Sequence, residues 1–319
     1  MLVYIKPLSI FPELHSDTIF GAITSAINEL YDEVVGEILS DFKENPPFIL
    51  SSAFPYLYDG NKKIKFYPKI ITANISTNKE DKSNEPIFEE DMDNMKKFKK
   101  VKYIQEEIFF KLASGELKEI DIIKNLDKYN VNGDLLTNND LIVEGKTSLR
   151  TIPNNSVNRI SQESENIFYS EGYEFKDMGL FFFIKFRENK YEEIIKSAIK
   201  FLKDRGFGGD ISVGKGNFDY EIEEYDLAKN EGNYFITLSR YIPNEEDLNK
   251  INEYSAYELG SKRAKASSGE LRKQIRFFKE GSTFPQYNDY YGKIVESGKN
   301  SPAIEYGYAF PFAYNNCGV

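Results

Sequence analysis

The sequence contains no tryptophan, one histidine and one cysteine among its 319 residues. The cysteine, Cys317, cannot form an internal disulfide, which fits a reducing compartment. A single histidine and a single cysteine exclude the usual zinc sites, and the acidic run at residues 89–93 lacks the spacing of an EF-hand calcium loop. We therefore expect no metal and no other cofactor.

Long apolar runs are missing as well. No stretch reaches the length of a membrane span, and the first residues lack the form of a signal peptide. We expect a cytoplasmic protein with no membrane partner. The hydrophobic content of 40% and the aromatic content of 15% are typical of a folded globular protein, and 319 residues suffice for two domains or one large one.

The chain has no excess of basic residues: 41 Lys and Arg against 51 Asp and Glu give a net charge of −10. A basic total is the usual sign of nucleic-acid binding, so this charge disfavours such a role, although the field at the contact face decides. Basic residues gather at residues 62–65, 96–102 and 262–276. Charge clusters are most often solvated faces, but the last one makes Lys262 and Arg263 candidate RNA contacts.

Glycine is concentrated in residues 206–218, which read Gly-Phe-Gly-Gly-Asp-Ile-Ser-Val-Gly-Lys-Gly-Asn-Phe. Apolar residues follow a helical period upstream and a strand period downstream, so this loop joins a helix to a strand. A P-loop has the opposite order and needs Ser or Thr where Gly216 stands, which disfavours nucleotide hydrolysis. A ligand-free turn remains possible. The other interpretation is a loop along a phosphodiester backbone, with contacts from Gly206, Gly208, Gly209, Ser212, Gly214, Lys215 and Gly216.

The clearest elements follow the order β-α-β-β-α-β, which is ferredoxin-like (RRM-like) and belongs to the α+β class. They are a strand at 2–8, a helix at 16–31, a strand near 141–150, a strand at 179–187, a helix at 190–204 and a strand at 217–225. Residues near 45–140 are then an insertion. The first domain spans residues 1–228, and residues 229–319 form a second, strand-rich domain. Ser16 is the predicted N-cap of the first helix, and Asp17 complements its dipole.

Several segments resemble the RAMP superfamily of CRISPR RNA-binding proteins. One is Leu14-His15-Ser16-Asp17-Thr18-Ile19-Phe20-Gly21, and another is the loop at residues 206–218. Lys279-Glu280-Gly281-Ser282-Thr283-Phe284 and Tyr306-Gly307-Tyr308-Ala309-Phe310 are similar to one branch, the fourth subunit of the type III-A (Csm) interference complex. The resemblance covers most of the chain except residues 74–140. It implies a RAMP domain followed by a second, degenerate ferredoxin-like domain.

The resemblance implies a role without catalysis. Such a subunit binds the 5′ handle of the guide RNA (crRNA) and contacts the large polymerase/cyclase-type subunit and a backbone subunit in antiviral defence. Its Gly-rich loop lies against the handle, and an inserted hairpin bends or splays nucleotides. Residues 145–159, with Lys146, Arg150 and Arg159, are the candidate for that hairpin or its base.

Single-stranded RNA is held by phosphate contacts and by stacking of bases on aromatic rings. Phe168, Tyr169, Phe207 and Phe218 are candidate stacking faces. An aromatic side chain beside a strand is nevertheless more often part of the core, so both interpretations stay open for each ring.

His15 supports the alternative function, a metal-independent RAMP endoribonuclease that processes CRISPR transcripts. Some RAMP proteins use a histidine for acid–base cleavage, but the sequence shows no identifiable partner for this one. A histidine at the start of a helix can equally cap the helix or touch a phosphate, so His15 and Ser16 are candidate RNA contacts. Asp17 could be compared with an acidic residue that cuts target RNA in other subunits, but its place in the first helical turn favours a structural role.

Overall fold

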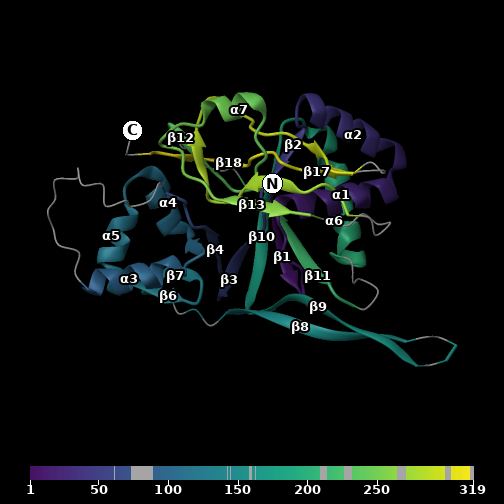
Figure 1. Cartoon of the computed structure of the whole chain (residues 1–319), viewed down its shortest axis with the longest axis horizontal. Helices are drawn as coiled ribbons and strands as arrows, with labels where there is room; N and C mark the ends of the chain where they lie inside the picture. Colours follow the sequence, from purple (N-terminus) through teal and green to yellow (C-terminus); the bar gives the residue numbers. More distant parts are fainter. Residues whose placement is uncertain are drawn as a thin grey trace.

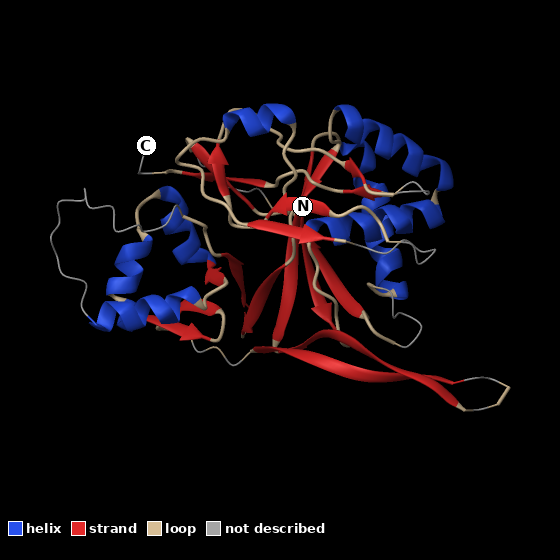
Figure 2. Ribbon diagram, viewed as in Figure 1, coloured by secondary structure: helices blue, strands red, loops and turns tan. Residues whose placement is uncertain are grey.

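The computed structural model is an α+β chain, which confirms the predicted class (Figures 1 and 2). A large sheet occupies the centre, helices lie around it, and a long two-stranded ribbon projects below. None of the described helices is long and apolar enough to cross a membrane. The described residues are 1–60, 62–72, 89–141, 143, 145–157, 160–161, 163–208, 214–225, 232–263, 271–298 and 303–316.

Four antiparallel strands form the core of the largest sheet, in the order β11-β1-β10-β3. Their bounds are Leu2–Pro7 (β1), Phe54–Asp59 (β3), Met178–Phe186 (β10) and Phe218–Glu223 (β11). The helices α1 (Ser16–Leu30) and α6 (Glu192–Arg205) contact each other, and each buries one apolar stripe in the same core. This order of strands and helices is compatible with the predicted ferredoxin-like arrangement.

The predicted position of the second strand, near residues 141–150, is wrong. β2 (Phe48–Leu50) and β3 pair with β10 instead, so that Phe48 faces Phe186 and Phe54 faces Phe181. Burial explains the difference, because β3 begins with four buried residues, whereas most side chains at residues 146–150 are exposed. The insertion therefore follows the second strand and does not precede it.

The insertion between β3 and β10 extends the sheet and adds the ribbon (Figure 1). Its elements are β4 (Lys62–Pro68), α3 (Glu89–Lys99), β5 (Tyr103–Gln105), α4 (Glu106–Ser114), α5 (Glu119–Lys124), η1 (Leu126–Lys128), β6 (Tyr129–Asn132), β7 (Leu135–Asn138), β8 (Lys146–Val157) and β9 (Ser164–Lys176). The strands β4, β5, β7 and β6 continue the sheet beyond β3, while β8 and β9 pair only with each other among the named strands. Outside the insertion, α2 (Asp32–Glu44) follows α1, and η2 (Asn189–Tyr191) precedes α6.

The C-terminal segment is strand-rich and packs onto the sheet. Its elements are β12 (Tyr234–Thr237), α7 (Glu245–Lys250), β13 (Leu259–Lys262), β14 (Ile275–Phe278), β15 (Thr283–Pro285), β16 (Val295–Glu296), β17 (Ile304–Glu305) and β18 (Pro311–Tyr314). The ring of Phe310 stacks on Phe183 of β10 with centroids 5.7 Å apart, and Phe312 stacks on Phe110 at 5.5 Å. The segment therefore shares one apolar core with the N-terminal sheet.

Candidate nucleic-acid interface

The Gly-rich loop has a backbone that requires glycine. Gly206, Gly208, Gly214 and Gly216 have φ angles of +97°, +102°, +80° and +75°, a region that other residues rarely adopt. A Cβ atom at Gly216 would lie 1.9 Å from the carbonyl oxygen of Phe207. At least these four glycines are therefore fixed by the shape of the loop itself.

Hydrogen bonds tie the described ends of the loop to each other and to the segment after β1. The backbone N–H of Phe207 donates to Gly216 O at 2.9 Å, and the N–H of Gly216 donates to Ile10 O at 2.9 Å. The loop leaves the C-terminus of α6 and enters β11, as predicted. The element that follows the loop is therefore a strand and not the N-terminus of a helix. This context does not suit a nucleotide-phosphate cradle.

Two of the four candidate stacking rings belong to the core. Phe207 and Phe218 are 4% and 1% exposed. Both pack against Phe11, with ring centroids 5.7 and 5.9 Å away. The stacking interpretation is therefore wrong for these two rings, because their side chains anchor the ends of the loop.

The other two rings lie on the ribbon and are exposed. Phe168 and Tyr169 of β9 are 50% and 68% exposed, and Ile167 beside them is 66% exposed. Consecutive residues of a strand point to opposite faces, so Phe168 and Tyr169 present one ring to each face of the ribbon. The predicted hairpin at residues 145–159 corresponds to β8 and the residues that follow it.

Lys215 brings the loop and the ribbon together. Its Nζ donates a hydrogen bond to Ser170 Oγ of β9. Gly172, two residues further along β9, pairs with Arg150 of β8. Since residues two apart in a strand share a face, Lys215 contacts the face of the ribbon that also carries Arg150.

The base of the ribbon is held against the segment that follows β1. Phe11 and Tyr173 exchange backbone hydrogen bonds of 2.9 and 2.8 Å. Gly172 lets the ribbon come close to this segment, because a Cβ atom at this position would lie only 2.4 Å from Ile10 Cγ2. The loop, the segment at residues 8–12 and the ribbon thus form one continuous surface.

Further predicted RNA contacts have different surroundings. Lys146 is exposed on the ribbon, and Arg150 pairs with Glu174 at 2.7 Å while its side chain stays 58% exposed. Arg159, Gly209 and Ser212 lie outside the described residues.

His15 lies away from this surface, in contact with two carboxylates. Its Nδ1 is 2.8 Å from Glu280 Oε1, and its Nε2 is 3.4 Å from Glu13 Oε1. Burial alone would lower the pKa of the imidazole, but the hydrogen bonds to Glu13 and Glu280 outweigh it and raise the pKa of His15 to about 9. At neutral pH this side chain is therefore a cation.

The cluster around His15 does not form a catalytic triad. Ser52 Oγ donates to the same oxygen of Glu280, at 2.5 Å, that His15 contacts. In a triad the serine would instead face the second ring nitrogen, which here faces Glu13. The carboxylate of Glu280 therefore joins the residue that precedes α1 and the connection between β2 and β3 to the C-terminal segment.

Ser16 is fully buried and is not available to RNA. Its N–H donates to Ser52 Oγ at 2.9 Å, and its hydroxyl accepts from the N–H of Arg240 at 3.1 Å. α1 begins at Ser16, so the N-cap residue is His15, which makes no side-chain cap bond. The prediction of Ser16 as the N-cap is therefore wrong.

Asp17 has a structural role, as its place in the first helical turn predicts, but it acts through ion pairs that the sequence did not reveal. Its carboxylate pairs with Arg240 at 3.1 Å and with Lys262, and Lys262 also pairs with Glu305 at 2.5 Å. Burial would raise the pKa of Asp17, but Arg240 and Lys262 hold it below its usual value. Lys262 is thus neutralised by two carboxylates.

Arg263, the neighbouring candidate, is exposed and donates from Nε to the carbonyl oxygen of Arg272 at 3.1 Å. Among the described residues, no group of three or more His, Cys, Asp or Glu side chains is placed to hold a metal ion.

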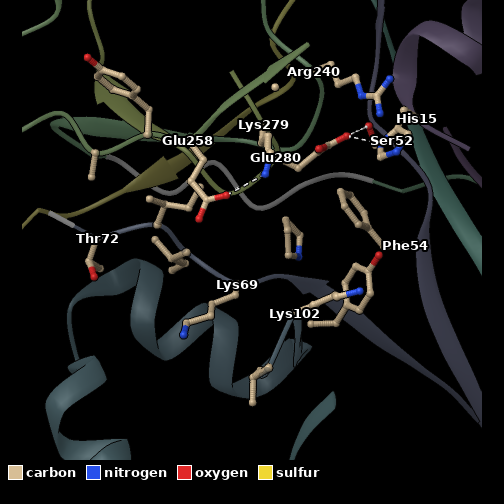
Figure 3. A pocket seen from close by; sticks show the side chains of 18 of the residues that line it. His15, Ser52, Phe54, Lys69, Thr72, Lys102, Arg240, Glu258, Lys279 and Glu280 are labelled. Carbon is tan, nitrogen blue, oxygen red and sulfur yellow. Dashed lines mark hydrogen bonds and ion pairs between the residues drawn. The ribbon is translucent and has the colours of Figure 1, made fainter. Parts of the chain in front are cut away.

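A cleft of about 1110 Å³ opens beside His15 (Figure 3). Lys69 and Lys102 lie on one side of it, and Glu258, Lys279 and Glu280 lie on the other. Its lining combines residues 13–15 and 52–54 of the N-terminal part with the insertion and the C-terminal segment. Sequence reasoning missed this cleft, because three distant parts of the chain build it.

Comparisons with known proteins agree with this architecture. Residues 230–314 match the family model of the CRISPR Csm4 C-terminal domain. A curated relative, the "CRISPR system Cms protein Csm4" of Thermococcus onnurineus (strain NA1), is 24% identical over 302 residues, which are 93% of this chain and 90% of the relative.

Two solved structures share the fold. The first is the crystal structure of a Csm3–Csm4 subcomplex in the type III-A CRISPR-Cas interference complex, with 20% identity, 99% of both chains covered and a TM-score of 0.69. The second, a Csm1–Csm4 cassette in complex with AMPPNP, has 20% identity, 98% and 96% coverage and a TM-score of 0.58. The predicted resemblance to the fourth subunit of type III-A complexes is therefore confirmed as a similarity, in the sequence of residues 230–314, in a curated relative and in the fold.

Proposed function

We propose that this chain is a non-catalytic, guide-RNA-binding subunit of a type III-A (Csm) effector complex. It binds the 5′ handle of the crRNA on the surface formed by the Gly-rich loop and the ribbon. The observation that carries the proposal is the contact of Lys215 with Ser170, since it joins both predicted RNA-binding segments. Positive side chains and exposed rings on one surface are what single-stranded RNA requires.

The partners follow from the solved relatives. One of them is assembled with Csm3 and another with Csm1. We propose that this chain likewise docks a backbone subunit and the large polymerase/cyclase-type subunit, in the cytoplasm. With a net charge of −10, the isolated chain is expected to bind RNA weakly, and its neighbours complete the groove.

The electrostatics of His15 and Asp17 support a role without catalysis. A histidine with a pKa of about 9 carries its proton at neutral pH, which does not suit a general base, and both ring nitrogens of His15 face carboxylates of the protein itself. The carboxylate of Asp17, 3% exposed, is paired with two cations. The alternative, a metal-independent endoribonuclease, requires specific cleavage of repeat RNA in EDTA that His15→Ala abolishes.

Binding of handle-bearing RNA tests the proposal. Fluorescence anisotropy measures the affinity of the chain, assembled with its backbone subunit, for two RNAs. One has the native 5′ handle and the other has a scrambled 5′ end. The native handle should bind more tightly, and Lys215→Ala should weaken binding and reduce the salt slope by about 0.7.

Lys196→Ala is the matched control, because Lys196 lies on α6 and pairs with Glu192 at 2.7 Å, away from the loop. It should bind both RNAs as the unaltered chain does. Equal affinity of the unaltered chain for both RNAs would refute handle recognition.

A further inference from the structure

The cleft beside His15 lies at the upper end of the size range of small-molecule sites and is built partly by the insertion. Its volume of about 1110 Å³ lies just above the roughly 300–1,000 Å³ of ordinary ligand pockets. Lys99 and Lys102 of the insertion line one wall, and Tyr257 and Lys279 of the C-terminal segment line the other. This shape suits a length of polymer between two walls.

The acidic residues of the lining are already bound within the protein. Glu13 and Glu280 contact His15, Glu258 pairs with Lys279 at 3.0 Å, and Glu119 pairs with Lys69 at 3.6 Å. Glu258 and Glu119 are each balanced by one lysine. Glu13 and Glu280 share the single charge of His15, so this cluster keeps one net negative charge.

Two lysines at the rim have no carboxylate of the described residues in close contact. Lys99 is exposed and has no ion-pair partner within the described part of the chain. Lys102 is 71% exposed, and its nearest carboxylate, that of Asp134, is 4.0 Å away. In all, the lining carries six cationic side chains against four carboxylates, the cations being His15, Lys69, Lys99, Lys102, Arg240 and Lys279. The cleft therefore favours an anionic ligand although the whole chain is acidic.

Tyr257 supplies an aromatic platform on the facing wall. Its ring lies 4.7 Å from the ring of Phe278 and nearly parallel to that of Phe284, at 12° and 6.1 Å. The rest of the side chain is open to solvent, and Tyr257 as a whole is 44% exposed. A ring fixed from behind and open in front is suited to stacking of a base.

One chain segment links the RNA surface proposed above to the lining of the cleft. The N–H of Gly216 donates to Ile10 O, and Gly208 lies against Pro12, so close that a Cβ on this glycine would be 3.6 Å from Pro12 Cγ. The next residues, Glu13 and His15, line the cleft. The short segment at residues 10–15 therefore leads from the Gly-rich loop into the cleft.

On the basis of the proposed function, we propose that this cleft is a second single-stranded RNA site, in which a base of the guide RNA stacks on Tyr257 and Lys99 and Lys102 hold its phosphates. The insertion then has a function of its own, as the wall that closes the path of the RNA.

Binding of single-stranded, handle-bearing RNA to the chain assembled with its backbone subunit tests this site. Tyr257→Leu should weaken binding at least about five-fold, since stacking on one ring is worth about 1–3 kcal/mol. Lys99→Ala with Lys102→Ala should reduce the salt slope by about 1.4, or 0.7 for each lost phosphate contact. The control pair, Lys96→Ala with Lys97→Ala, lies on α3, the helix that ends at Lys99, but outside the cleft lining, and it should leave the slope unchanged.

The outcomes separate the two proposals. Normal binding by both cleft variants, with weakened binding by Lys215→Ala, would overturn the cleft site and leave the loop site standing. If the cleft variants bind RNA normally but fail to assemble with the Csm subunits, the cleft is a protein-docking site and the proposed RNA site is overturned. Loss by the cleft variants with an unaffected Lys215→Ala would support the cleft and overturn the loop site. Thermal melting of the lysine pair, which removes only exposed side chains, excludes misfolding as the cause.

Discussion

The charged state of His15 gives a prediction that can be followed at a single site. Because this is the only histidine in the chain, its imidazole signals in an NMR pH titration need no assignment by mutation. We expect a midpoint near pH 9, well above the usual 6.5. The cause is the pair of carboxylates, Glu13 and Glu280, that hydrogen-bond to the protonated ring.

The same shift links stability to pH. With its pKa raised on folding, His15 stabilises the native state fully below pH 6.5, and this contribution is lost as pH rises through 9. The interval corresponds to about 3 kcal/mol at 1.36 kcal/mol per pH unit. His15 is 21% exposed, so solvent screening removes only part of this free energy.

Urea unfolding at pH 6 and pH 9 measures the effect. His15→Gln should lower the free energy of unfolding by about 2–3 kcal/mol at pH 6 and by much less at pH 9. The control, Lys190→Gln, removes one partner of an exposed ion pair with Glu37 and should change stability little at either pH. An imidazole midpoint near 6.5, or a His15→Gln effect equal at both pH values, would refute the reasoning.

Four further substitutions, one of them a control, test other parts of the structure. Gly216→Ala should destabilise the fold by at least about 1–2 kcal/mol in urea unfolding, because φ is +75° and a Cβ meets Phe207 O at 1.9 Å; Gly21→Ala, with nothing within 4 Å, should instead stabilise by about 1 kcal/mol. Asp17→Asn should cost about 3–5 kcal/mol in the same assay, since Arg240 and Lys262 lose a buried counter-charge. Tyr169→Ser, at a residue 68% exposed, should leave unfolding within about 0.5 kcal/mol and weaken RNA binding about five-fold.

Local periodicity accounts for the parts of the fold that the sequence predicts well. The strand predicted at residues 217–225 is observed at Phe218–Glu223, and the helix predicted at 190–204 is observed at Glu192–Arg205. Both have apolar residues at a spacing that only one kind of element can bury. The Gly-rich loop was located for a similar reason, since its glycines are demanded by backbone angles within the loop itself.

Contacts between distant residues account for the parts that were missed. The second strand was misplaced because its position in the sheet depends on the pairing of β2 and β3 with β10, which no local pattern indicates. Arg240 contacts Asp17 across 223 positions of sequence, so no local pattern indicates that pair. The exposure of an aromatic ring is equally non-local, which is why Phe207 and Tyr169 could not be told apart before their surroundings were known.

The covering of β10 by the C-terminal segment has a consequence for synthesis of the chain. Phe183 is made long before Phe310, the residue that stacks on it. Until residues 304–314 have left the ribosome, the nascent sheet exposes aromatic rings that are buried in the finished protein. Contacts so distant in sequence form slowly, and exposed apolar surface favours aggregation in the meantime. We therefore expect chains interrupted before β18 to be insoluble and to require chaperones.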